Sequence, residues 1–174
     1  HGSQSGTGSI ENVTVNSNGR AGVHLDEFRS GITLKCVGGD SNPVTFDITR
    51  AKLGGGSILL MDPKSEGAGL GDPAVTPAIR FTGPNAPITL TVLGGNFLAP
   101  AGVNKSAIQI SADSTQNPMI QIIGLVTGNT IPLLIDDQKN AIQIPCTPLA
   151  YHSVFAYCGG KYMRFDPTGF TTVP

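Results

Sequence analysis

The chain has 174 residues, 39% of them hydrophobic and 13% charged, and this length and balance suit a single domain. Its formal net charge is −1, with eleven basic residues scattered among twelve acidic ones, so a nucleic-acid partner, which would need clustered cations, is not expected. No apolar stretch is long enough to span a bilayer, so membrane insertion is not expected either.

The first eight residues resemble the remnant of a cleaved expression tag followed by a linker. Alternating apolar residues then predict strands at about 10–15, 21–26 and 31–37, with a turn of Asn, Ser and Gly at 16–19. We therefore expect strand structure to begin at about residue 9, in a chain that is an excised part of something longer.

Residues 32–39 return as residues 88–95, at an offset of 88 − 32 = 56. The preceding strand repeats at the same offset, because Val23 and Leu25 are answered by Ile79 and Phe81, and His24 by Arg80. Cys36 occupies the place of Val92 in this alignment, which predicts a small buried side chain rather than a reactive thiol. Repeated strands without intervening helices predict a β-solenoid.

Between the two copies, residues 44–48 predict a strand with Phe46 inward and Asp47 outward, and residues 58–61 form an apolar run. Residues 62–77 show no period and predict a long loop. The 56-residue offset therefore fits either two rungs or one rung with this loop. A looser third copy spans about 107–135, and residues 142–144 are placed to start a fourth.

Aromatic residues concentrate after residue 146, which predicts a different module at 146–174. Gly159 and Gly160 suit a two-residue hairpin turn, which places Tyr157 opposite Tyr162. Because the last rung of a solenoid exposes unpaired backbone and an open core, we expect this module to form a cap or an oligomer contact. The residues assigned to that role are Tyr151, Phe155, Tyr157, Tyr162 and Phe165.

The repeated short strands, exemplified by residues 31–36, the Asn- and Gly-rich turns and the aromatic end resemble the right-handed parallel β-helix of pectate-lyase-like proteins. More narrowly, residues 9–145 are similar to the C-terminal part of a trimeric bacteriophage tail spike or tail fibre. This resemblance implies an all-β parallel β-helix, a homotrimer, a location in the virion tail outside the cell, and binding of host surface polysaccharide. Fold alone does not fix function.

Two other functions stay open. The first is a polysaccharide lyase or glycoside hydrolase, which would place paired carboxylates on either side of one glycosidic bond. The second is a secreted or surface-attached bacterial adhesin, which would be monomeric.

Adjacent carboxylates such as Asp26 and Glu27 point to opposite faces of a strand, so solvated turn carboxylates are the main interpretation.

No cofactor or metal motif is present in the sequence, and neither His24 nor His152 has partners at a catalytic spacing. If a polysaccharide site exists, we expect it near the charged residues that flank two of the early strands. These residues are Asp26, Glu27, Arg29, Asp47 and Arg50.

Overall fold

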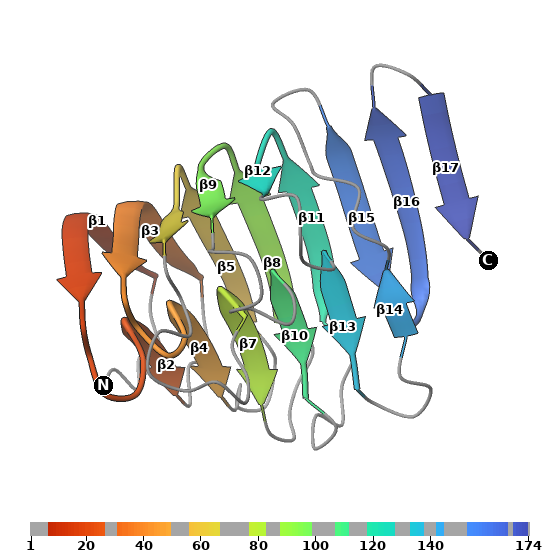
Figure 1. The fold of residues 1–174 in the computed structure, drawn as a ribbon. Helices are drawn as coiled ribbons and strands as arrows, with labels where there is room; N and C mark the ends of the chain where they lie inside the picture. Colours follow the sequence, from red (N-terminus) through yellow and green to blue (C-terminus); the bar gives the residue numbers. More distant parts are fainter. Residues whose placement is uncertain are drawn as a thin grey trace.

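The computed structural model describes residues 7–26, 31–49, 56–66, 77–82, 88–98, 107–111, 118–127, 133–137, 142–144, 153–166 and 169–173. Every regular element in these ranges is a β-strand, and the strands form two sheets in which parallel pairing predominates (Figure 1). The described part of the chain contains no helix suited to crossing a membrane. The predicted all-β class is confirmed.

The smaller sheet contains six strands in the order β14-β13-β10-β7-β4-β2. All of its pairs are parallel except β13 with β14. Its strands are β2 (Val23–Asp26), β4 (Phe46–Thr49), β7 (Ile79–Thr82), β10 (Ile108–Ile110), β13 (Leu134–Asp136) and β14 (Ile142–Ile144).

The larger sheet contains two parallel stacks that share β3, because the first half of β3 pairs with β5 and its second half with β6. The first stack contains β3 (Ile32–Asp40), β5 (Gly56–Met61), β8 (Ile88–Leu93) and β11 (Met119–Ile123). The second adds β6 (Lys64–Glu66), β9 (Asn96–Leu98) and β12 (Val126–Thr127), and β1 (Gly8–Asn16) pairs with β3 along both halves.

The chain visits the smaller sheet, the first stack and the second stack in the same order on successive passes (Figure 1). Val23 pairs with Phe46, which pairs with Ile79, so the 56-residue offset contains two passes of 23 and 33 residues. In the first stack Ile32 pairs with Ile58, which pairs with Leu90, at an offset of 90 − 32 = 58. The sequence alignment of Ile32 with Ile88 is therefore wrong by two residues, a shift that keeps the same face inward.

The core is made of inward-facing residues that stack directly above one another. In the first stack Leu34, Leu60, Val92 and Ile122 form one such column, and all four are buried. The smaller sheet packs against the second stack, where the rings of Phe46 and Phe97 lie 6.4 Å apart between centroids. Burial of such columns is the main stabilising contribution to a stacked sheet.

A column of residues with positive φ marks the bend between the two stacks of the larger sheet. It consists of Asn12, Cys36, Asp62, Gly94 and Gly124, with φ between 48° and 71°. The predicted burial of Cys36 is wrong, because this side chain is exposed at the bend, and Leu34 is the residue in register with Val92. At the bend the backbone adopts positive φ, so the side chain there does not continue the alternation of inward and outward residues along the strand.

Three further expectations need correction. The stretch 62–77 is not strand-free, because β6 lies within it and pairs with β3 and β9. Residues 142–144 do form a strand, but it runs antiparallel to β13 and so does not begin a further parallel pass. The first strand also begins at Gly8, inside the stretch expected to be linker.

The C-terminal strands are β15 (Val154–Cys158), β16 (Lys161–Asp166) and β17 (Gly169–Val173), and they form an antiparallel meander on the edge of β11. The predicted hairpin is confirmed, with Gly159 and Gly160 both at positive φ and Tyr157 opposite Tyr162. Phe155 pairs with Ile122 and is buried, so the aromatic residues of β15 extend the core columns.

Candidate functional site

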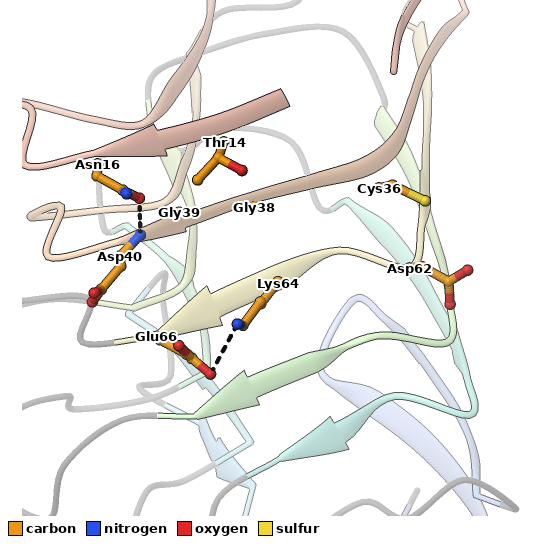
Figure 2. A pocket seen from close by; sticks show the side chains of 9 residues that line it. All are labelled: Thr14, Asn16, Cys36, Gly38, Gly39, Asp40, Asp62, Lys64 and Glu66. Atoms are coloured by element: carbon orange, nitrogen blue, oxygen red, sulfur yellow. Dashed lines mark hydrogen bonds and ion pairs between the residues drawn. The ribbon is translucent and has the colours of Figure 1, made fainter. Parts of the chain in front are cut away.

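A hollow of about 410 Å³ lies on the outer face of β1, β3 and β6. Thr14, Gly38 and Lys64 occupy equivalent positions on these three strands, and Lys64 packs so closely against Gly38 that an added Cβ there would lie 2.7 Å from Lys64 Cβ. Figure 2 shows the side chains around the hollow. The lining residues are Thr14, Asn16, Cys36, Gly38, Gly39, Asp40, Asp62, Lys64 and Glu66.

One end of the hollow contains three charged groups. Lys64 Nζ lies 3.2 Å from Glu66 Oε1, and both side chains are about half exposed. Asp40 accepts a hydrogen bond from the Ser41 hydroxyl at 3.2 Å, and its backbone N–H donates to Asn16 Oδ1 at 2.9 Å (Figure 2). The carboxylates, the amide and the ammonium group are thus held at the ends of short strands and remain accessible to a ligand.

The other end of the hollow lies at the bend, where Cys36 and Asp62 project from neighbouring strands (Figure 2). None of the described residues that line the hollow is aromatic. Groups of three or more His, Cys, Asp or Glu able to hold a metal ion are absent from the ranges that the structure describes. The carboxylate, hydroxyl, amide and ammonium groups of the lining can therefore form hydrogen bonds with the hydroxyl groups of a sugar.

A second polar cluster lies on the outer face of the smaller sheet around Asp47, whose side chain is 0% exposed. Arg80 Nε donates to Asp47 Oδ1 at 3.1 Å, and His24 Nδ1 lies 3.2 Å from Asp47 Oδ2. Arg20 Nε is 3.8 Å from the same Oδ2 atom. Since His24, Asp47 and Arg80 are in register on adjacent strands, the cluster is a consequence of the stacking.

The predicted site residues meet different outcomes. Asp47 was expected to point outward as a solvated carboxylate; it does alternate with the inward Phe46 and Ile48, but the prediction of solvation is wrong because Arg80 and His24 cover it. Asp26 lies on β2, in register with Thr49 of β4. The predicted site residues outside the described ranges are Glu27, Arg29 and Arg50, together with Tyr151 of the predicted cap.

The residues of the hollow were not predicted as a site. Two sequence signals could have pointed to them: the Gly38-Gly39 pair inside a strand, which marks a position without side chains, and the alternation of Lys64 and Glu66 around Ser65. Neither signal tells which strands lie side by side. The hollow becomes visible only when Thr14, Gly38 and Lys64 are aligned.

Comparisons of this chain with protein-family models, with curated proteins and with solved structures give no match. Any functional conclusion therefore depends on the geometry and chemistry of the described residues. Fold class by itself assigns no activity.

Proposed function

We propose that this chain is part of a parallel β-helix that forms a rigid shaft and binds host surface polysaccharide, in the manner of a bacteriophage tail spike or tail fibre. The ordered passage through three parallel stacks supports the β-helix, because each pass adds one strand to each stack. The proposal includes a homotrimeric assembly and a location in the virion tail, outside the cell.

The observation on which polysaccharide binding rests is the hollow on β1, β3 and β6. Its lining combines acceptors, such as Asp40 and Glu66, with the donors of Lys64 and Thr14, all of them on β-strands. A rigid strand scaffold limits the conformational entropy lost on binding, which favours recognition of a repeating, hydroxyl-rich chain. The open outer face also leaves room for a polymer to continue beyond the hollow.

The test is a binding assay with capsular and O-antigen polysaccharides, with dextran as the uncharged comparison. The double variant Asp40→Asn, Glu66→Gln removes two anionic acceptors while retaining their size. If the hollow binds the polysaccharide, the variant should weaken binding about tenfold or more, since a hydrogen bond to a charged group contributes about 1.5–3 kcal/mol.

The matched control is Glu11→Gln, which removes a carboxylate from β1 outside the hollow lining and should leave affinity unchanged. Failure of every polysaccharide to bind, or equal binding by the double variant and the wild type, would contradict the proposal.

A second candidate function is hydrolytic or eliminative cleavage of the bound polysaccharide, because three carboxylates, Asp40, Asp62 and Glu66, line one hollow. Glycosidic cleavage uses a proton donor and a nucleophile or base on either side of the scissile bond. The same incubations distinguish the two functions, since an enzyme releases new reducing ends or unsaturated uronates and a binding protein releases neither.

A further inference from the structure

An exposed apolar row crosses five adjacent strands of the larger sheet. Met61 pairs with Leu93, Leu93 with Ile123, Ile123 with Val154, and Val154 with Phe165. Each of these residues alternates with a buried neighbour along its strand, so the whole row points away from the core. Figure 1 shows β5, β8, β11, β15 and β16 side by side in this order.

The row is most exposed in its C-terminal half. Met61 and Leu93 are partly buried, whereas Ile123 is 47%, Val154 42% and Phe165 51% exposed, and on the neighbouring row Met163 is 52% exposed. Large apolar side chains exposed singly are ordinary, but a contiguous set on one flat sheet face is typical of an interaction surface. We call the outward positions of β5, β8, β11, β15 and β16 the apolar face.

The apolar face is almost free of charge. Lys161, at its margin, is the one charged residue among the outward positions of these five described strands. The other described outer faces differ, since the hollow contains Asp40, Lys64 and Glu66 and the smaller sheet contains Asp47 with its arginines. A surface that matches the apolar face must itself be uncharged, because an unpaired charge buried against it would be strongly unfavourable.

We propose that the apolar faces of copies of this chain pack together around the threefold axis of the proposed trimer. Each face then meets the apolar face of a neighbouring copy, which meets its requirement for an uncharged partner. Strand spacings make the face about 14 Å by about 19 Å, which suits the apolar centre of a standard interface. Thr89, Thr91 and Gln121 supply polar groups within it.

This inference deepens the proposed function, because it assigns the contact through which the proposed trimer would form. The apolar row runs across the strands, along the direction in which the passes stack. Copies aligned side by side would therefore bring their rows together along their full length.

The decisive experiment is sedimentation of the whole chain over a range of concentrations, with the wild type and the double variant Met163→Glu, Phe165→Glu. The wild type should sediment as a multiple of 18.0 kDa, near three times that mass for the proposed trimer. The variant should raise the dissociation constant at least about thirtyfold, because the exchange buries two charges in the contact.

The control is Leu98→Glu, which introduces one such charge at an exposed apolar residue, 41% exposed, on β9 of the second stack. It should leave the assembled mass unchanged. The double variant Met163→Ser, Phe165→Ser adds no charge. It should also raise the dissociation constant, and it replaces the glutamate variant if that variant unfolds.

A wild type that stays monomeric at every concentration overturns the inference. So does a Leu98→Glu control whose dissociation constant rises as much as that of the Met163→Glu, Phe165→Glu variant. Polysaccharide binding is measured on the same samples. A monomer that still binds polysaccharide contradicts the apolar contact but not the glycan proposal, whereas an assembled protein that binds none contradicts only the latter.

Discussion

At the residue scale, Asp47 shows how stacking changes the meaning of an outward position. Its neighbours Phe46 and Ile48 point into the core, so Asp47 points to the other face of β4. There the strands on either side supply His24 and Arg80, and the carboxylate is fully covered. A buried carboxylate of this kind depends on its charged partners, because it has lost its hydration.

Replacing Asp47 by Ala should lower the free energy of unfolding by about 3 kcal/mol, because Arg80 then loses the carboxylate that compensates its charge. Asp40→Ala is the matched control, since Asp40 is exposed and accepts a hydrogen bond from the adjacent Ser41; we expect a change within about 0.5 kcal/mol. Urea denaturation measures both values. Equal losses in the two variants would show that Asp47 has no structural role beyond that of a surface carboxylate.

Cys36 is a second residue whose environment differs from the one that its strand pattern predicts, here because of backbone geometry. In the sequence it continues the alternation of Ile32 and Leu34, and that pattern predicts burial. In the structure it occupies the bend, with φ at +50°, in one column with Gly94 and Gly124. An added Cβ at Gly94 would collide with Asp62 Oδ1, so the bend also restricts which side chains fit above one another.

At the element scale, the C-terminal meander occupies the edge that the parallel strands leave open. β15 pairs antiparallel with β11, and Tyr157 and Phe155 continue the columns of Ile120 and Ile122. Tyr162 stacks on Phe155 with ring centroids 5.9 Å apart, which joins β16 to the same cluster. Without this meander, β11 would present unpaired backbone groups beside an open core.

A chain truncated after residue 152 lacks β15, β16 and β17, and we expect it to aggregate, because both the strand edge and the apolar columns become exposed. Truncation after residue 168 is the control: it removes only β17, which pairs with β16 alone among the described strands. Size-exclusion chromatography with light scattering compares them. If the shorter chain stays soluble and keeps the assembly state of the wild type, the capping role is wrong.

At the scale of the whole molecule, the two ends of the stack differ. The C-terminal end is covered by the meander, whereas β1 pairs with β3 and with no other described strand. The side chains of β1 are nearly all exposed, including Ile10 and Val13, which continue core columns. In a stacked architecture each layer is stabilised mainly by its neighbours, so β1, which has one neighbour and exposed side chains, should open more easily than a strand that lies between two neighbours.

Amide hydrogen exchange should therefore be graded along the stack. The amides of β8, which lies between β5 and β11, should exchange at least about 100-fold more slowly than the hydrogen-bonded amides of β1, because local opening of an edge layer breaks fewer contacts. Exchange followed by NMR or mass spectrometry measures this ratio. Equal protection of the two strands would mean that another surface covers β1 in solution.

The amino-acid sequence alone was sufficient to predict the all-β class, the positions of most strands, the inward series such as Phe46 and Ile48, and the hairpin at Gly159 and Gly160. These features are predictable because they depend on local signals: alternation with period two, turn residues and positive φ.

Only the tertiary structure decided which strands are neighbours. The strand pairing shows that the 56-residue offset contains two passes and that residues 142–144 run antiparallel to β13. It also places His24 and Arg80 beside Asp47, and Gly38 beside Lys64 at the hollow. It also aligned Ile123, Val154 and Phe165 in one exposed row. A local pattern specifies which face of a strand points inward, but register and partner depend on contacts between residues far apart in the chain.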